Sequence, residues 1–440
     1  MTERHSIVDF GEPEKEKSII KVIGVGGGGG NAVNHMYREG IHDVTFVLCN
    51  TDAQALNDSP VPVHLQLGKE GLGAGNMPQK AREAAAEESI EDIRKMLNDG
   101  TKMAFITAGM GGGTGTGAAP VIARVSKELG ILTVGIVTIP FRFEGERKID
   151  QALDGVEEMS KHVDALLVIN NERLREIYPE MPILDAFGKA DDTLRVAAKS
   201  IAEIITVHGI INLDFNDVKT VLKDGGVAIM STGYGEGEGR VKHAIEDALN
   251  SPLLNDNDVF NSKKILLSIS FSGEKGNKSG LMMDEMSDVN DFMSKFGQKF
   301  VLKWGLATDP ELGEKIKVTI LATGFGIEDV DGMNTHISKK HTQEESERRA
   351  EEEEKDAERR AKREHYYGPD SKSAKYKRRP NMYIFTEDSL DNDDVISSVD
   401  STPTYKRTRQ ELEEIKSQAT GDIKKKETED NKIQGTIKFA

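Results

Sequence analysis

The chain has 440 residues and a mass of 48.3 kDa, a length that favours two folded domains followed by a linker or tail. Its 58 basic and 75 acidic side chains give a net charge of −17 at pH 7, which argues against nucleic acid and anionic lipid as partners. The one cysteine, Cys49, excludes an internal disulfide framework, and no stretch approaches the roughly 18 consecutive apolar residues of a membrane-spanning helix. We therefore expect a cytoplasmic protein without direct membrane insertion.

After a charged extension over residues 1–17, residues 18–207 alternate short β-branched runs with helical stretches. This alternation predicts an α/β domain in which parallel strands are joined by crossover helices. The expected strands are almost continuously apolar, as in a sheet covered on both faces, and comprise residues 19–25, 44–49, 103–107, 131–138 and 165–169. A long helix over residues 183–207 keeps one apolar face and could join two domains.

Residues 208–327 are strand-rich and predict a smaller α+β domain. Its expected elements are strands at residues 227–231, 264–271 and 317–323, and helices at residues 240–249 and 284–296. Beyond it, Leu, Ile, Val and Phe are too scarce for an independent core, so we expect a charged disordered linker over residues 328–399 and a tail over residues 400–440. Within the linker, residues 344–364 hold 17 charged side chains in 21, which predicts either disorder or an isolated charge-paired helix.

A run of glycines follows the first expected strand, where residues 26–30 are all glycine and Asn31 precedes a helical stretch. Such a turn directs consecutive backbone N–H groups and the positive end of a helix at one point, which suits a phosphate group. The G-x-G-x-x-G spacing that starts at Gly24 also matches a dinucleotide fingerprint, with Asp52 placed to bind a ribose. Three interpretations of this run are possible at this point: a phosphate loop, the site of an NAD-dependent oxidoreductase, or a tight turn without a ligand.

A second glycine-rich loop, residues 109–117, follows the strand at residues 103–107 and again leads into a helical stretch. Two such loops at the ends of two strands predict one polyphosphate held from both sides, with the Thr114 and Thr116 hydroxyls as further donors. Neither loop has the lysine of the G-x-x-x-x-G-K-[ST] motif, which excludes an ordinary P-loop. An oxidoreductase has no obvious need for the second loop, and the sequence offers no plausible histidine for hydride transfer.

The sequence GGGTGTG at residues 111–117 resembles the signature of the tubulin/FtsZ family, and residues 21–33 match bacterial members of that family almost letter for letter. The match continues at residues 50–56, 143–145, 184–188 and 251–254, within a resemblance that covers residues 18 to 326. The resemblance implies a tubulin-like fold, in which a Rossmann-type parallel-sheet GTPase domain is joined by a long central helix to a smaller α+β domain, followed by a disordered tail. It also implies an assembly-dependent GTPase that binds GTP and GDP with Mg²⁺ on the phosphates. Head-to-tail polymerisation would form the cytokinetic ring at the division site.

The resemblance assigns the nucleotide contacts residue by residue. The implied phosphate contacts come from the two glycine loops and are Gly27, Gly28, Gly29, Gly30, Asn31, Gly113, Thr114 and Gly115. Glu144 matches the ribose-binding glutamate of the family, although a surface carboxylate at a helix start would look the same. Lys148 stands where the family often has an arginine, and Arg147 lies beside it. Which of the two reaches the nucleotide stays open, because a lysine cannot form a bidentate fork. No residue is assigned as a metal ligand.

Guanine selection requires an acceptor for the N1–H and N2–H groups of the base, and the resemblance places Asp192 of the long helix in that role. Phe187 is implied to cover the face of the base, and Asn31 to touch it. By its apolar neighbours alone, Phe187 is more typical of a core residue.

Asn212, Asp214 and Asp217 match the catalytic loop of the family, which is inserted against the γ-phosphate held by a neighbouring subunit. The residues alone favour a different interpretation, in which Asp214 is the N-cap of a following helix and Asp217 lies near its positive end. The presence of all three side chains argues against a family member that binds nucleotide without hydrolysing it.

Residues 400–410 resemble the short C-terminal peptide by which the family binds membrane-tethering division proteins. The segment has a proline, an aromatic residue and then arginines, namely Pro403, Tyr405, Arg407 and Arg409. A disordered segment without a partner would have the same composition.

Overall fold

The structure, a computed structural model, describes residues 18–430 apart from residues 42, 208, 251–258, 274–279, 297–299, 331, 368–380 and 387–388. The predicted extension over residues 1–17 and the family-like segment at residues 251–254 lie outside the described residues. The chain divides into two compact units, the first ending at Thr342 and the second starting at Gln343. The first unit holds both predicted domains.

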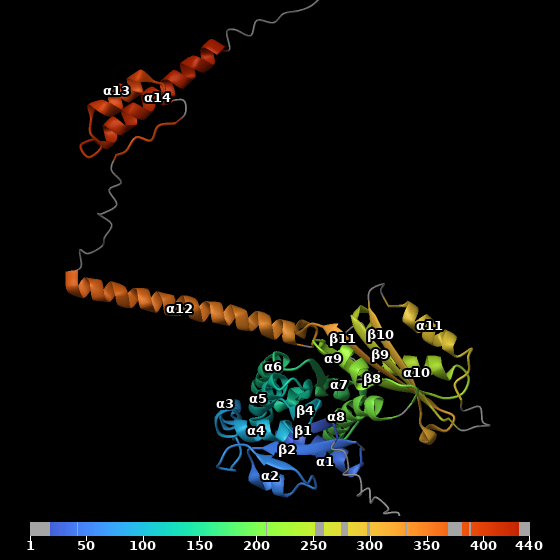
Figure 1. The fold of residues 1–440 in the computed structure, drawn as a ribbon. Coiled ribbons are helices and arrows are strands. Elements are labelled where there is room, and N and C mark those ends of the chain that lie inside the picture. Colours follow the sequence, from blue (N-terminus) through green and yellow to red (C-terminus); the bar gives the residue numbers. More distant parts are fainter. Residues whose placement is uncertain are drawn as a thin grey trace, which may run out of the picture. The chain divides into compact units, whose positions relative to one another are not determined.

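The amino-terminal half of the first unit is built on a parallel sheet (Figure 1). Its strands are β1 (Ile20–Val25), β2 (Val44–Asn50), β3 (His64–Gln66), β4 (Met103–Gly109), β5 (Leu132–Ile139) and β6 (Ala165–Asn170). Its helices are α1 (Gly26–Arg38), α2 (Ala53–Asn57), α3 (Pro78–Glu83), α4 (Ile90–Leu97), α5 (Thr114–Glu128), α6 (Glu146–Ser160) and α7 (Asn171–Ile177). Each predicted strand is present, and β3 is an additional one.

The carboxyl-terminal half continues the same sheet. Its strands are β7 (Gly209–Ile211), β8 (Gly226–Gly235), β9 (Lys264–Phe271), β10 (Val301–Thr308) and β11 (Ile316–Phe325), and its helices are α9 (Phe215–Leu222), α10 (Arg240–Leu249) and α11 (Met286–Ser294). Within the described residues, one eleven-stranded sheet runs in the order β3-β2-β1-β4-β5-β6-β8-β11-β9-β10-β7. β8 is parallel to β6 but antiparallel to β11, so this half is mixed, as expected of an α+β fold. A π-helical turn, η1 (Ala84–Glu88), and 3₁₀ turns η2 (Arg142–Glu144), η3 (Val259–Asn261), η4 (Pro310–Leu312) and η5 (Ile327–Asp329) complete the first unit.

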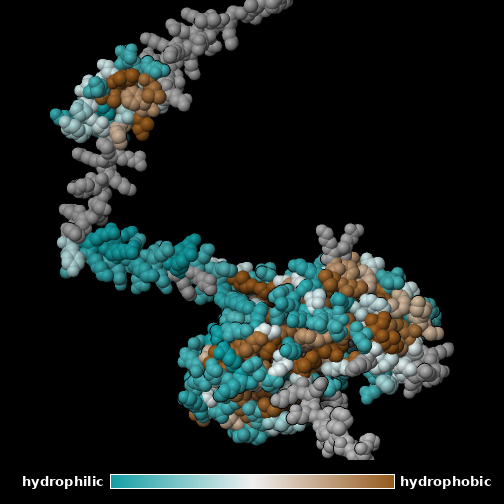
Figure 2. Space-filling view, in the orientation of Figure 1, coloured by the Kyte–Doolittle hydropathy of each residue, from teal (hydrophilic) through white to brown (hydrophobic). Residues whose placement is uncertain are grey.

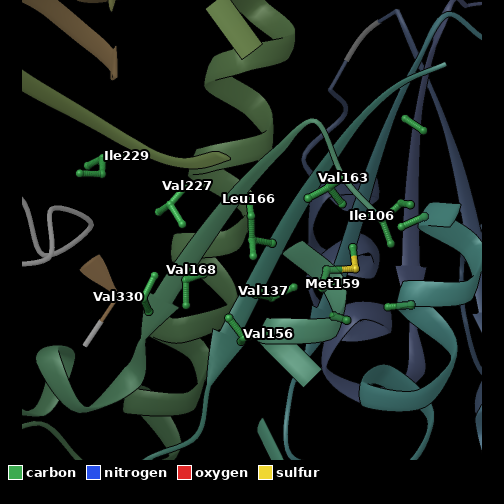
Figure 3. Close-up of a cluster of buried hydrophobic side chains, with 14 of the residues drawn as sticks. Ile106, Val137, Val156, Met159, Val163, Leu166, Val168, Val227, Ile229 and Val330 are labelled. Atoms are coloured by element: carbon green, nitrogen blue, oxygen red, sulfur yellow. The ribbon is translucent and has the colours of Figure 1, made fainter. Parts of the chain in front are cut away.

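The central strands are buried on both faces of the sheet, which explains their unbroken apolar sequences. Successive residues enter opposite cores, so that Val22 and Phe105 belong to one buried cluster while Ile23 and Ile106 belong to the other. The cluster that contains Ile106 also reaches β8 and Val330, as Figure 3 shows. The two predicted domains therefore share both a sheet and a core.

Helix α8 (Ile183–Thr206) confirms the long helix predicted over residues 183–207. It follows Pro182, whose ring restricts φ to a value that suits a helix start. Its apolar stripe, including Leu194, Ala198 and Ile201, is buried in the same cluster as Val33 of α1. The stripe thus fixes α8 against α1, which starts at Gly26 and so includes the glycine run that sequence places in a turn before the helix.

Helix α12 (Met333–Tyr367) contains the charge-dense segment, so the structure has the helical one of the two alternatives predicted for residues 344–364. Ion pairs four residues apart accompany it, among them Lys355–Glu351 at 3.3 Å and Lys362–Glu358 at 3.8 Å. Figure 2 shows the surface of this segment as hydrophilic. None of the described helices combines the length and the apolar character needed to cross a membrane.

Sequence predicts no fold for the linker over residues 328–399 or for the tail over residues 400–440, but a described helix pair spans their boundary. It consists of α13 (Asp393–Ser401), which lies mostly in the predicted linker, and α14 (Arg409–Asp430) in the tail. Val395 and Ile415 are buried within this small module. Arg407, only 4 % exposed, donates to the carbonyls of Asn381, Val399 and Thr402. One buried guanidinium thus supplies the order that the few apolar residues cannot.

Candidate functional site

The two glycine loops meet at the carboxyl ends of β1 and β4, which are neighbouring parallel strands. Their backbones are in direct contact, since a Cβ atom added to Gly28 would lie 3.2 Å from the Cα of Gly109. One added to Gly26 would lie 2.8 Å from the backbone nitrogen of Gly115. Residues without side chains are therefore required where the loops touch, and both loops face the same end of the sheet.

Other glycines of the same loops face open space. A Cβ atom on Gly27, Gly30 or Gly112 would have no neighbour within 4 Å. Because α1 starts at Gly26 and α5 at Thr114, the unpaired N–H groups of both first turns lie beside this space. The arrangement provides donors and the positive ends of two helices for one anionic ligand.

The predicted phosphate residues divide between these two settings. Gly29 is packed, because a Cβ there would lie 2.2 Å from the carbonyl oxygen of Thr107. Gly113 and Gly115 are packed as well, with close neighbours at Ala74 and at the carbonyl of Gly109. These glycines shape the loops, whereas the open glycines leave room for a ligand.

Threonine hydroxyls occupy two different roles at the second loop. Thr114 lies with its Oγ1 atom 2.7 Å from Oγ1 of Thr51, at the end of β2. Thr116 is buried, and its hydroxyl oxygen accepts a hydrogen bond from the N–H of Gly111 at 2.9 Å. Thr116 thus holds the loop rather than facing a ligand, and Thr51 joins the site although sequence reasoning did not select it. Its position at the end of the strand beside β1 is the signal that could have found it.

A further segment missed by sequence reasoning lies over the second loop. A Cβ on Gly113 would contact the side chain of Ala74 and the backbone of Met77, and one on Gly117 would contact the carbonyl of Pro78. Glycines recur through residues 68–75, with positive φ at each, which is the sequence signal of an unusual loop. This loop borders the space in front of the second glycine loop.

Asp52, the ribose-binding acid of the oxidoreductase alternative, is the N-cap of α2. Its carboxylate accepts hydrogen bonds from the N–H groups of Gln54 at 2.9 Å and Ala55 at 3.3 Å. Capping α2 explains why an acidic residue stands at this position, so Asp52 is not evidence for a bound dinucleotide.

Glu144 and Lys148 lie against the second glycine loop. Nζ of Lys148 is 2.5 Å from one carboxylate oxygen of Glu144, and the other oxygen accepts from the N–H of Phe141 at 2.9 Å. The carbonyl of Lys148 is only 2.6 Å from where a Cβ on Gly111 would lie. Lys148 is thus beside the loop and bound to the candidate ribose acid, while Arg147 is exposed.

Phe187 is not the core residue that its apolar neighbours suggest, because its side chain is 40 % exposed. Its ring makes edge contacts with Phe141 at 5.3 Å and Phe143 at 6.3 Å between centroids. An exposed aromatic ring supported by two others is a suitable platform for a planar base. Phe141 and Phe143 lie just before Glu144 in sequence, so the cluster joins α8 to the segment that carries Glu144.

The carboxylate of Asp192 forms ion pairs with two neighbouring basic side chains. Its carboxylate lies 2.5 Å from Arg195 and 3.3 Å from Lys189. Partial burial works to raise the pKa of Asp192, but the hydrogen bonds from Arg195 and Lys189 outweigh it and hold the pKa below its usual value. Burial raises the pKa of the neighbouring Asp191 to about 6. Asp192 is therefore ionised at neutral pH and can act as a hydrogen-bond acceptor.

The acidic loop forms the cap predicted from the residues alone. Asp214 accepts from the N–H of Asp217 at 2.8 Å, and Asp217 accepts from the N–H of Asp214 at 3.2 Å. Lys303 of β10 lies 2.9 Å from Asp217, and its hydrogen bond holds the pKa of Asp217 below the usual value. Asn212 accepts from the N–H of Gly209 at 2.6 Å. Asp214 and Asp217 thus contact each other, whereas the side chain of Asn212 contacts the start of β7.

The acidic loop and the glycine loops do not form one site within this chain. The acidic loop follows β7, which ends the described sheet, and six strands separate β7 from β4. At about 4.8 Å per strand this is a separation on the order of 30 Å. The two sets of predicted site residues are therefore far apart within one chain.

In the predicted tail peptide, Tyr405 is 80 % exposed and Lys406 lies over its ring, with Nζ 5.8 Å from the ring centroid. Arg407 is buried in the fold of the module, as described above, and its guanidinium faces inward. Arg409 is exposed. The segment therefore presents Tyr405 and Arg409 outward, but not Arg407.

Three family models match the chain: the Tubulin/FtsZ family GTPase domain at residues 19–179, the FtsZ family C-terminal domain at residues 226–326, and the FtsZ C-terminal model at residues 377–422. The cell division protein FtsZ of Porphyromonas gingivalis is 52 % identical over 405 residues, covering 89 % of this chain and 85 % of that protein. The cell division protein FtsZ of Azotobacter vinelandii is 46 % identical and covers 71 % of this chain and 78 % of that protein. An empty FtsZ dimer of M. jannaschii has a TM-score of 0.64 and 40 % identity, covering 71 % of this chain and 89 % of that one. The chain belongs to the tubulin/FtsZ family of GTPases.

Proposed function

We propose that this GTPase polymerises in bacterial cell division and that GTP bound by one subunit is hydrolysed with the help of the acidic loop of the next. The observation that carries the proposal is the separation of the two sets of predicted site residues within one chain. The glycine loops offer donors for a polyphosphate but no carboxylate, whereas Asp214 and Asp217 offer carboxylates at the far edge of the sheet.

GTP binds at the carboxyl ends of β1 and β4. The N–H groups around Gly27, Gly30 and Gly112 hold the phosphates, and the positive ends of α1 and α5 favour their charge. Glu144 accepts from the ribose hydroxyls, with Lys148 neutralising it beside the loop.

The base binds on the side of the site formed by α8. The ionised carboxylate of Asp192 accepts from the N1–H and N2–H groups of guanine, and the exposed ring of Phe187 covers the base. Asn31, at the end of the first loop, lies on the exposed face of α1 and contacts the base edge.

The donor set suits Mg²⁺ held chiefly by the nucleotide. Thr51 and Thr114 place two hydroxyl oxygens together at the second loop, and Mg²⁺ is commonly held by substrate phosphates with few protein ligands. When bound, the ion neutralises phosphate charge. Cations are needed because residues 1–327 carry a net charge of −13, the 113 residues after them being nearly balanced.

In the acidic loop, Asp214 is the residue best placed to orient the attacking water. The described hydrogen bonds engage one oxygen of Asp214 and both oxygens of Asp217, which leaves Oδ2 of Asp214 for a water molecule. The water gives a proton to Oδ2 of Asp214 and attacks the γ-phosphorus in line as the bond to the bridging oxygen breaks, giving GDP and phosphate. Asp217 and Asn212 position the loop.

A loop that completes the site of the next subunit creates a heterologous contact. Repetition of such a contact without closure gives a filament. Hydrolysis is then coupled to assembly, because an isolated subunit has no acid at its nucleotide.

Asp214→Asn tests this mechanism without removing the cap, since asparagine caps a helix about as well as aspartate. We expect GTP binding and light scattering by filaments to persist while phosphate release falls by about 100-fold or more, as for loss of a general base. Asp309→Asn is the matched control, because Asp309 also caps a turn of the same half but lies outside the acidic loop. Normal phosphate release by Asp214→Asn would remove this residue from the mechanism.

The tail module supports a second contact, with membrane-tethering division proteins, which would bring filaments to the division site at midcell. Because Arg407 is buried, the contact falls to Tyr405 and Arg409. The double variant Tyr405→Ala/Arg409→Ala should lose recruitment of a fluorescent fusion to midcell and still polymerise in vitro, whereas Gln410→Ala should behave as wild type. Recruitment that survives the double substitution would refute the assignment.

A further inference from the structure

After β11, the last described strand in sequence, the chain returns to the amino-terminal half. Val330 and Met333 are buried, and Ile337 packs against the same core cluster. This cluster includes Val156 and Met159 of α6 (Figure 3). The first two turns of α12 are therefore anchored in the core, beside a helix that belongs to the GTP-binding half.

Four polar side chains reinforce this contact. Lys340 lies 3.1 Å from Asp154 and 2.7 Å from Glu157, and His336 lies 3.2 Å from Asp154. Lys161 adds a second cation 3.1 Å from Glu157. The hydrogen bond from Lys340 holds the pKa of Glu157 below its usual value, so the carboxylate is ionised at neutral pH.

Asp154, Glu157 and His336 also lie close enough together to bind a metal ion, with ligand atoms within 4.8 Å of one another. Lys340 argues against that use, because its ammonium group already contacts both carboxylates and would repel a dication. The cluster is better explained as an ion-paired clamp between α6 and α12.

Helix α6 connects this clamp to the nucleotide. It starts at Glu146, directly after Glu144 and Gly145, and Lys148 in its first turn contacts the second glycine loop. Asp154 is six residues beyond Lys148, about 9 Å along the helix. A shift of the clamped part of α6 is therefore transmitted to Lys148, since a helix moves as a rigid element over so short a distance.

We propose that residues 333–340 form a brace that positions α6, and through it Glu144 and Lys148, so that the brace controls the release of GDP. The proposal rests on the assignment of Glu144 and Lys148 to the nucleotide in the proposed function. Lys340, Asp154 and Glu157 act here as positioning residues, because none of them contacts the nucleotide.

The test compares Lys340→Gln with Lys339→Gln in the full chain. Both variants lose one positive charge from the same turn, but only Lys340 contacts α6 and Lys339 is exposed. We expect Lys340→Gln to accelerate the release of a fluorescent GDP analogue by about threefold to tenfold, a usual range for coupling between sites. Lys340→Arg, which keeps the positive charge beside Asp154 and Glu157, should release the analogue as slowly as wild type.

Hydrogen exchange of α6 in the nucleotide-free protein separates this proposal from the nucleotide assignment. Faster exchange at residues 146–153 in Lys340→Gln, together with faster GDP release, supports the brace. Release and exchange equal to those of Lys339→Gln overturn it, and so does faster exchange without faster release. Nucleotide affinity unchanged in Glu144→Gln would instead overturn the nucleotide assignment, whatever the exchange of α6.

Discussion

The two halves of the sheet differ in how their predicted site residues are engaged. In the half that contains β1 and β4, the glycines assigned to the phosphates in the proposed function face open space. In the half that contains β7 and β10, the acidic residues are bound to one another and to a lysine. Gly27 and Gly112 have no neighbour where a side chain would be, and the first turns of α1 and α5 keep free N–H groups. By contrast, the carboxylates of Asp214 and Asp217 accept hydrogen bonds from each other's backbone N–H groups at the start of α9, and Lys303 forms an ion pair with Asp217.

This difference indicates that the two halves have different roles in the proposed function. The GTP-binding half is prepared to receive a ligand from solution. In the acidic loop, Asp214 and Asp217 are already hydrogen-bonded to each other's backbone N–H groups, which fixes the start of α9 without a ligand. The proposed function accordingly assigns nucleotide binding to one half and the acidic loop to the other.

The largest expected effect separates packed glycines from open ones. Gly29→Ala should destabilise the nucleotide-free protein by about 3 kcal/mol or prevent folding, because the new Cβ would lie 2.2 Å from the carbonyl of Thr107. Gly27→Ala should change stability by no more than about 0.5 kcal/mol, because its Cβ meets nothing. The added methyl group should nevertheless weaken GTP binding by about tenfold, through loss of close backbone approach.

Urea unfolding of the nucleotide-free variants, followed by titration with a fluorescent GTP analogue, measures both quantities. If Gly27→Ala bound GTP as wild type does, the open space would not be the phosphate site. Equal stability of the two variants would contradict the packing of the loops.

A smaller effect concerns the acidic half. Lys303→Gln removes the hydrogen bond that lowers the pKa of Asp217. A carboxylate with a depressed pKa contributes stability above its unfolded pKa of about 3.9, and that contribution is lost as pH falls through the folded value. The variant should therefore have a lower melting temperature than wild type near pH 7, and the difference should vanish once the pH has fallen through the folded pKa of Asp217.

Thermal unfolding between pH 7 and pH 2.5 measures this difference, with the exposed Lys242→Gln on α10 as the matched control. A difference that persisted unchanged at the lowest pH would show that Lys303 acts through something other than the charge of Asp217. Phosphate release should fall less than in Asp214→Asn, since Asp217 only positions the loop.

The sequence predicted the parts of the fold that depend on local pattern. The strands that form β1, β4, β5 and β6 are unbroken apolar runs because both faces of the sheet are covered. β3 has three residues, and β10 is largely half-exposed and interrupts its apolar residues with Lys303 and Gly305, so neither has a clear periodic signal. The shared sheet and core of the two halves depend on contacts distant in sequence, which no local pattern reveals.

The same limit applies to the site. The glycine loops and the Asp214 cap were predictable because their signals are contiguous in sequence. Thr51 reaches Thr114 only through the pairing of β1 with β2 and β4. The exposure of Phe187 and the burial of Arg407 likewise arise from tertiary packing, against the tendency of each residue type.

The central claim is that the nucleotide site is completed by a second subunit. Phosphate release per subunit, measured together with light scattering as the protein concentration is raised, tests it most directly. The account expects almost no turnover below the concentration at which scattering begins and a rise in turnover with scattering above it. Turnover per subunit that stayed constant across the whole range would show that one chain hydrolyses GTP alone and would contradict the account.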